Sequence, residues 1–432
     1  MSIKKYSQSV ALLLMCILPC HGQENNLREH VVFLADSIGN RYPGSDGDLA
    51  AQYYISRHFT ENGLECRSHV FEIVEYVWGT GALQLHKGEK VTDFRFGSDF
   101  TVSGSGAADT LLTGYVVVGN SLPDSLLSHL KDKTVIQLLQ RNGNNVAKHP
   151  ISIHEIKQAG ARAQIHCMPP GTDVKTRKTK GNRNPQPHQI PILNIRHDHL
   201  VEFLPQGIID SIADRVYIAP PSHRVSIAAQ HHEQLLHTAN IIGIKKGTCD
   251  KHIIIGAHYD TCAPDPKTGA PRIGANDNAS GVAMLLELAE RLHDISTQHN
   301  IIFVAFGGEE KGCLGSMAFV NEMPFKSADI TEMINLDMVG KMTNGRLFFK
   351  QFHEPAIRPD DIRTSGITLT EGPDAGSDHA DFVRAHISAS YFHTGSDPTI
   401  HTPEDTSDKL NYMGMTQILN FLLNYIIAVD RS

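Results

Sequence analysis

Blocks of apolar residues along the chain predict strands and helices that follow one another. From residue 225 on, short apolar runs are typical of buried strands, and the clearest lie at 253–255, 301–306 and 333–336. Between the first two runs, five apolar residues have helical spacing: Val282, Leu285, Leu286, Ala289 and Leu292. This spacing predicts a helix that packs by one face. Strands that alternate with helices indicate an α/β fold with a mostly parallel sheet flanked by helices.

The earlier part of the chain predicts a second, smaller domain. Residues 26–59 have a helical pattern, 68–77 read as a strand, and a Gly/Ser/Ala-rich stretch at 102–108 indicates a junction. After it come short strands at 115–118, 134–139, 163–166 and 190–195 and a helix at 151–159. We therefore expect a small α/β insertion at 101–220 within a larger domain formed by 23–100 and 221–432.

The N-terminal residues resemble a signal for export. Two lysines at 4–5 precede an apolar run at 10–18, and polar residues begin after Gly22. The run is shorter than the roughly 20 apolar residues that span a bilayer, so we expect a signal peptide at 1–22, no transmembrane span, and a secreted or periplasmic protein. A lipid anchor on Cys16 or Cys20 is less favoured, because the preceding residues are not small.

Composition excludes some classes of protein and leaves others open. The 432 residues are 41% hydrophobic, enough for one large or two ordinary domains. A net charge of -8 gives no reason to expect nucleic acid as a partner. Five scattered cysteines follow residue 22, and their spacing defines neither a disulfide framework nor a thiolate zinc site. Oligomeric state is open.

Acidic and histidine side chains follow the ends of the predicted strands or begin the helix between them. The set is His258, Asp260, Asp277, Glu309, Glu310, Asp337 and His401. Because the carboxyl ends of parallel strands meet at one edge of a sheet, we expect these residues to converge. Carboxylates in contact would repel one another without a cation. Imidazole nitrogen with carboxylate oxygen suits catalytic zinc. Five ligands of this kind from the set would be too many for one tetrahedral zinc but would suit two ions that share a carboxylate.

Five motifs, in order over roughly 238–406, resemble those of the co-catalytic dizinc exopeptidases typified by secreted bacterial leucine aminopeptidases and yeast aminopeptidase Y. They are His258-Tyr-Asp260, Asn276-Asp277-Asn278-Ala-Ser-Gly281, Gly307-Gly-Glu-Glu310, Asn335-Leu-Asp337-Met338 and Ile400-His401-Thr402. The insertion at 101–220, by its order of elements, resembles the protease-associated domain found in several peptidase families. The resemblance implies peptide substrates and two Zn²⁺ ions.

The resemblance also implies a set of metal ligands. One zinc would be held by His258 and Asp337. The other would be held by Glu310 and His401, and Asp277 would bridge the two ions. Relatives often have a cis peptide bond after the bridging aspartate.

Other residues receive implied roles in catalysis and in substrate binding. Glu309 would be the general base that takes a proton from a zinc-activated water and passes it to the leaving amine. Asp260 would orient His258 from behind. By position, four residues are candidates for substrate binding: Met338, Tyr391, Phe392 and Ile400. Some relatives have a tyrosine just before a Ser-Asp-His segment, where this chain has Ala375-Gly376, so Tyr391 is a substitute candidate for the oxyanion partner.

The sequence favours an aminopeptidase and leaves alternatives open. A carboxypeptidase, a dipeptidase or a single-zinc glutaminyl cyclase could use the same scaffold. A receptor-like relative that has lost its metals is disfavoured, because no ligand position is lost in this chain.

Overall fold

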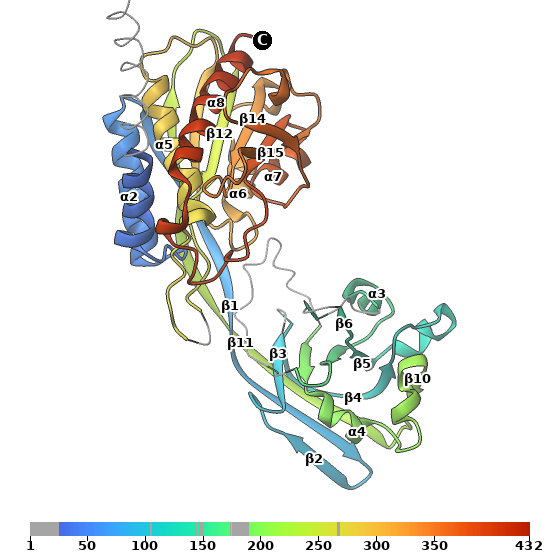
Figure 1. Cartoon of the computed structure of the whole chain (residues 1–432). Helices are drawn as coiled ribbons and strands as arrows, with labels where there is room; N and C mark the ends of the chain where they lie inside the picture. The colour runs from blue at the N-terminus through green and yellow to red at the C-terminus, as the bar shows by residue number, and fades with distance from the viewer. Residues whose placement is uncertain are drawn as a thin grey trace, which may run out of the picture. The chain divides into compact units, whose positions relative to one another are not determined.

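The structure is a computed structural model that describes most of the chain (Figure 1). The described residues are 26–103, 106–142, 145–146, 151–172, 174, 190–265 and 268–432. They form two compact units, one made of the chain up to Ile73 together with Leu236–Ser432, and the other of Val74–Leu235. The expected signal peptide at 1–22 lies outside the described residues.

The second unit is larger than the expected insertion at 101–220, since it spans Val74–Leu235. Two long strands explain the difference. β1 (Glu65–Lys87) and β11 (His223–Lys245) each begin in one unit and end in the other. Inside an unbroken strand, neither the composition nor a turn residue marks the point where one unit ends and the other begins. The boundaries expected from the sequence therefore fall at Gly-rich and polar stretches instead.

The first unit contains the mostly parallel sheet that the sequence predicts. Its strand order is β16-β15-β17-β14-β12-β13-β11. The strands, apart from β11, are β12 (His252–His258), β13 (Asn300–Phe306), β14 (Ile330–Leu336), β15 (Arg346–Phe352), β16 (Thr368–Glu371) and β17 (Ala389–His393). β12, β13, β14 and β17 run parallel, while β11 and β15 are antiparallel to their neighbours β13 and β17. In the register His258 lies opposite Phe306, and Gly256 opposite Asn335, so the three central strands end at one edge.

Helices cover both faces of this sheet. The α-helices that pack on it are α2 (Asp46–Glu61), α5 (Ser280–Leu292), α6 (Leu314–Glu322), α7 (His379–Arg384) and α8 (Tyr412–Asp430). Side chains alternate along β13: Ile301, Phe303 and Ala305 pack in the core with α2, α5 and α8, whereas Ile302, Val304 and Phe306 pack with α6 and α7. Alternation with both faces apolar is typical of a strand buried between two helix layers.

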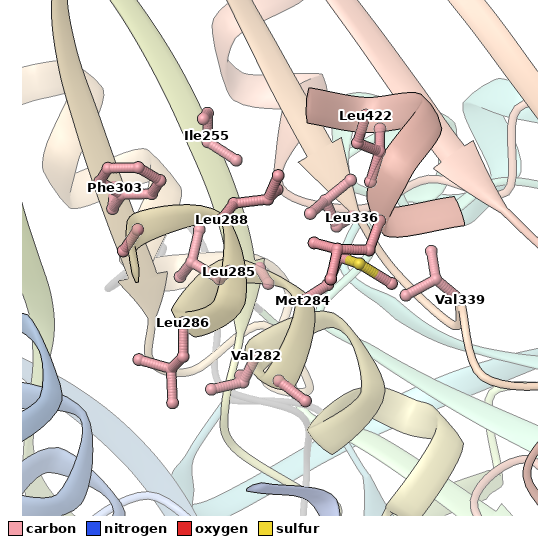
Figure 2. Close-up of a cluster of buried hydrophobic side chains, with 14 of the residues drawn as sticks. Ile255, Val282, Met284, Leu285, Leu286, Leu288, Phe303, Leu336, Val339 and Leu422 are labelled. Atoms are coloured by element: carbon pink, nitrogen blue, oxygen red, sulfur yellow. The ribbon is translucent and has the colours of Figure 1, made fainter. Parts of the chain in front are cut away.

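Helix α5 is buried all round from Ser280 to Ala289 rather than on one face. Besides the predicted apolar positions, Met284 and Leu288 are fully buried, and Figure 2 shows side chains of α5 surrounded by apolar residues of the strands and of α8. The reason is that α5 contacts the strands on one side and both α2 and α8 on the other. The helix that begins next to the predicted bridging aspartate is therefore held rigidly by the core.

Helix α8 also belongs to the core. Among the described residues it is the one helix long and apolar enough to cross a membrane. Its most apolar 18 residues have a mean hydropathy of 1.3, and 61% of them are buried. Its residues Ile418, Leu422 and Ile426 are fully buried in the same cluster as α5. We interpret α8 as a core helix.

The second unit has its own core, and its strands follow β11 in the sheet in the order β4-β5-β8-β9-β3. These strands are β3 (Phe100–Ser103), β4 (Ala108–Val118), β5 (Lys133–Leu138), β8 (Ala163–Cys167) and β9 (Ile192–Ile195). The four strands predicted in this region are present, and the predicted helix is α3 (Ile153–Gln158). Ser152 and Glu155 form a capping box at its first turn.

The remaining elements are short. The strands are β2 (Lys90–Phe94), β6 (Arg141–Asn142), β7 (Asn145–Val146) and β10 (Val216–Ile218). The helical segments are α4 (Leu200–Phe203), η1 (Phe33–Ile38), η2 (Asp124–Leu130), η3 (His197–His199), η4 (Ile209–Asp214), η5 (Ala275–Ala279), η6 (Ser327–Asp329), η7 (Pro359–Asp361) and η8 (Ser407–Lys409).

Candidate metal centre

Three strand ends bring the predicted site residues to one edge of the sheet in the first unit. His258 is the last residue of β12, and Asp337 directly follows β14. Glu309 and Glu310 follow β13 after a turn in which Gly308 has a φ of +72°, a conformation that favours glycine. Because the strands are parallel and in register, these side chains meet.

The first cluster of donor atoms surrounds His258, which is 1% exposed. Its Nε2 atom lies 3.2 Å from Oδ1 of Asp277 and 3.5 Å from Oδ1 of Asp337. One ligand atom from each of the three residues lies within 4.8 Å of the others. These three residues are the protein ligands that the sequence predicts for one zinc.

The second cluster surrounds His401. Its Nε2 atom lies 3.1 Å from Oδ2 of Asp277 and 3.2 Å from Oε2 of Glu310. Asp277 thus points one oxygen at each cluster, which is the arrangement expected of a bridging carboxylate.

Asp260 touches three of the other site residues. Its Oδ1 accepts the backbone N–H of Glu309 at 3.0 Å, and its Oδ2 accepts that of Glu310 at 3.2 Å. Oδ1 also lies 3.5 Å from Nδ1 of His258. The carboxylate of Glu309 lies on the other side of the ring, with Oε2 4.0 Å from Nε2 of His258. One buried carboxylate therefore holds the backbone of the predicted base and of the predicted ligand Glu310, and it lies beside the ring of His258.

The segment with Asp277 is held from two directions. The Asp277–Asn278 peptide bond is cis, as the family resemblance led us to expect. Asn278 donates from Nδ2 to the Leu336 carbonyl, and its Oδ1 accepts the N–H groups of Gly281 and Met338. These bonds join the Asp277 segment to the end of β14 and to the first turn of α5. Gly281 permits the approach, since a Cβ there would lie 2.5 Å from the Leu336 oxygen.

Asp405 supports the same segment from the loop that contains His401. Its carboxylate accepts the backbone N–H groups of Asn276 and Asp277 at 3.0 to 3.1 Å. Nζ of Lys341 lies 3.6 Å from Asp405 and 2.7 Å from Asp397, so a cation faces both acids. Two segments that supply ligands are thereby tied together.

Burial and mutual charge shift the protonation of the site. Burial raises the pKa of Glu309 well above its usual value, helped by neighbouring carboxylates, and burial with the charge of Asp277 raises the pKa of Glu310. Hydrogen bonds to Asp277 and Glu310 raise the pKa of His401 to about 10. Burial opposes a charge on His258, but the surrounding carboxylates outweigh it and raise its pKa. Without cations, the cluster therefore holds extra protons.

The donor set fits divalent metal ions. Within the described part of the chain, neither ring nitrogen of His258 nor Oδ1 of Asp337 has a hydrogen-bond partner of good geometry, although these atoms are buried. Buried polar atoms normally have a hydrogen-bond partner, so unpaired polar atoms that face one another indicate that a shared partner belongs between them. Two imidazoles with three carboxylates, one of them shared, match the preferences of zinc in a two-metal site.

The four candidate substrate-binding residues lie in different surroundings. Ile400 is 37% exposed beside His401, and Met338 follows Asp337 in a left-handed conformation, with a φ of +57°. Tyr391 is buried and stacks between His379 and His393, with ring centroids 4.5 and 4.9 Å apart.

The expectation for Phe392 is wrong. It is fully buried, and its ring packs against Phe421 and Tyr425 of α8 at 5.8 and 5.6 Å. Phe392 follows Tyr391 on β17, and successive side chains of a strand point to opposite faces. Phe392 therefore belongs to the core and not to a substrate pocket.

Sequence reasoning missed several residues around the site. Arg41 is fully buried and donates to the carbonyls of Leu34, Gly39, Tyr259, Ile273 and Gly274. Burial lowers its pKa to about 10, while four site carboxylates oppose the shift. No motif marks Arg41, because its role depends on contacts across more than 200 residues. Asp405, in contrast, lies four residues after His401 and could have been considered.

Asp378 and Cys262 were also missed. Asp378 is fully buried, and burial raises its pKa to about 7, with the charges of Asp260 and Asp337 adding to the effect and that of His258 opposing it. Cys262 donates from Sγ to Oε2 of Glu310 at 2.9 Å. Cys262 lies two residues after Asp260, which could have indicated a place near the site. The cysteines as a set are scattered, so this position did not stand out.

The sheet and the two donor clusters define a class: α/β domains with a candidate two-metal site. Residues 240–426 match the family model described as Peptidase family M28. All seven site residues that the sequence predicts lie inside this range.

Known proteins are similar to part of this chain. Aminopeptidase YwaD of Bacillus subtilis is 33% identical over 192 residues, which cover 40% of this chain and 40% of that protein. A probable leucine aminopeptidase of Arthroderma otae is 30% identical over 206 residues, 43% of this chain and 56% of that protein. The match thus spans less than two thirds of the length of these relatives.

Solved structures share the fold over nearly the whole chain. The aminopeptidase of Aneurinibacillus sp. strain AM-1 superposes with a TM-score of 0.67 at 23% identity, covering 93% of both chains. BSAP, a zinc aminopeptidase from Bacillus subtilis, superposes with a TM-score of 0.57 at 19% identity, covering 94% of both. At these identities the likeness shows the fold alone.

Proposed function

We propose that this protein is a zinc-dependent aminopeptidase that removes N-terminal residues from peptides. The observation that carries the proposal is Asp277, whose two oxygens lie 3.2 and 3.1 Å from histidines of two separate clusters. The M28 family match and the aminopeptidase names of two relatives support the reaction type. We further propose that the signal-like residues 1–22 direct the protein to a secreted or periplasmic location.

The geometry supports a particular set of ligands. His258 and Asp337 would hold one zinc, Glu310 and His401 the other, and Asp277 both. Two zinc ions, when bound, would lower the pKa of a water to about 7 and polarise the scissile carbonyl.

Glu309 would move the proton in this reaction. Its carboxylate reaches toward the first cluster, 4.0 Å from Nε2 of His258. It would take a proton from the attacking water and donate it to the leaving amine. Asp260 serves this step indirectly, because it fixes the backbone of Glu309 and faces the opposite edge of the His258 ring.

The substitution Glu309→Gln tests the role of this residue. It keeps the shape and removes the proton acceptor, so kcat should fall by about 10² to 10⁴ while two zinc ions stay bound. Hydrolysis of aminoacyl anilides and the metal content by mass spectrometry are the two readouts. Glu290→Gln, on the exposed end of α5, is the matched control and should keep wild-type activity. If Glu309→Gln keeps the wild-type kcat, Glu309 is not the general base.

Blocked peptides distinguish the aminopeptidase from its alternatives. A peptide with an amidated C-terminus should be cleaved, and the same peptide with an acetylated N-terminus should not. The reverse pattern would identify a carboxypeptidase, and cyclisation of N-terminal glutamine would identify a cyclase. A protein that binds no zinc and cleaves no peptide would be a non-catalytic relative.

A further inference from the structure

Cys262 lies among the predicted ligands of the second metal. Its Sγ atom is 2.9 Å from Oε2 of Glu310, and the same oxygen is 3.2 Å from Nε2 of His401. The three donor atoms all lie within 4.8 Å of one another. Sulfur, oxygen and nitrogen donors thus converge at one point.

A small cavity lies at this point of convergence. Its volume is about 10 Å³, and its lining includes Cys262, Asp277, Glu310 and His401. A cavity needs roughly 10 to 15 Å³ to hold a single water. The space therefore suits one monatomic ion with four donor groups around it, which is the coordination number that zinc prefers.

The backbone before the thiol is fixed. Nδ2 of Asn40 donates to the Cys262 carbonyl at 2.8 Å and to Oγ1 of Thr261 at 3.0 Å. The backbone N–H of Arg41 donates to the same Thr261 hydroxyl at 2.9 Å. These bonds position Cys262 without any help from Glu310.

We propose that the Cys262 thiolate is a fourth protein ligand of the ion held by Asp277, Glu310 and His401. The proposal rests on the proposed function, because it presumes that this half of the site binds metal. On coordination the S–H bond breaks, its proton leaves to solvent, and a sulfur–metal bond forms.

The extra ligand would make the two halves of the site unequal. Four protein donors fill the tetrahedral shell of this ion and add a soft sulfur that prefers Zn²⁺, Co²⁺ or Cd²⁺ to hard cations. The ion at His258 and Asp337 has only one nitrogen and two carboxylates, so the open position would lie there, on the side of Glu309.

Cobalt spectroscopy tests the sulfur ligand directly. The chelator-treated protein, reloaded with two equivalents of Co²⁺, should show a near-ultraviolet sulfur-to-cobalt charge-transfer band. Cys262→Ser should lose the band and bind the second ion at least about 10- to 100-fold more weakly, since loss of even an indirect partner costs that much. Cys313→Ser is the matched control and should keep the band, because Sγ of Cys313 lies 3.5 Å from Glu309 and not in the cluster.

A second measurement needs no variant. Zinc should protect Cys262 of the wild-type protein from alkylation by iodoacetamide, as read by peptide mass spectrometry, while the exposed Cys249 reacts equally with and without zinc. Two bound cobalt ions without the band, or alkylation of Cys262 in the zinc-loaded protein, would overturn the sulfur ligand and leave the aminopeptidase proposal intact. A protein that binds no metal would overturn both.

Discussion

Glu332 is a buried acid in the core whose protonation should control stability. It lies on β14, and its Oε1 accepts hydrogen bonds from the hydroxyls of Ser390 and Tyr425, each at 2.5 Å. Its Oε2 has no hydrogen-bond partner among the described residues. Burial raises the pKa of Glu332 from 4.5 to about 7, although the two hydrogen bonds oppose the shift.

The sign of the effect follows from proton uptake. Between pH 4.5 and about 7 the folded protein holds a proton on Glu332 that the unfolded chain has released, so the free energy of unfolding falls as pH rises through this window. At about 1.4 kcal/mol for each pH unit, the loss amounts to about 3 kcal/mol. Above about pH 7 both states are ionised and the effect is constant.

The substitution Glu332→Gln removes this dependence. The amide keeps an oxygen for Ser390 and Tyr425 and carries no charge. We expect similar stability of the two proteins at about pH 4.5, and a variant more stable by about 3 kcal/mol at about pH 8. Urea unfolding followed by circular dichroism, in excess chelator so that metal binding does not contribute, gives the free energies.

The difference between the two proteins is the decisive quantity, because all other titrating groups cancel in it. A difference that does not change between about pH 4.5 and about pH 8 would refute the raised pKa. A variant that loses stability at high pH would refute the sign.

Two further predictions concern the metal centre. Asp277→Ala should lose both metal ions, because one oxygen faces each cluster, and two ions retained in a metal analysis would contradict the bridge. Asp405→Asn should weaken metal binding by about 10- to 100-fold, because its carboxylate positions the backbone of Asp277 without being a ligand. Zinc competition with a chromophoric chelator measures this, with the exposed Asp408→Asn as control; equal affinity in both variants would show that the support is dispensable.

The sequence predicts the part of the site that lies at strand ends. His258, the Glu309–Glu310 pair and Asp337 each follow a short apolar run, and parallel strands must bring such positions to one edge. His401 lies on an irregular loop after Tyr391 and Phe392, so its place at the same edge was predicted less directly than that of the other three positions. The mostly parallel sheet was predictable for the same reason.

Other features depend on packing that no local pattern encodes. The boundaries of the second unit fall within the continuous strands β1 and β11, where the sequence has no break. Helix α5 is covered on its outer side by α2 and α8, which lie far away in sequence. The position of Phe392, in contrast, was predictable from a local pattern. Side chains alternate along a strand, so Phe392 and Tyr391 could not both face the site.

The distance along the chain between the clustered residues has a consequence for biosynthesis. His401 lies 143 residues after His258, yet both approach the same carboxylate of Asp277. A growing polypeptide therefore lacks the second half of the centre until translation has passed His401. Metal binding by both clusters together therefore cannot precede the synthesis of residue 401.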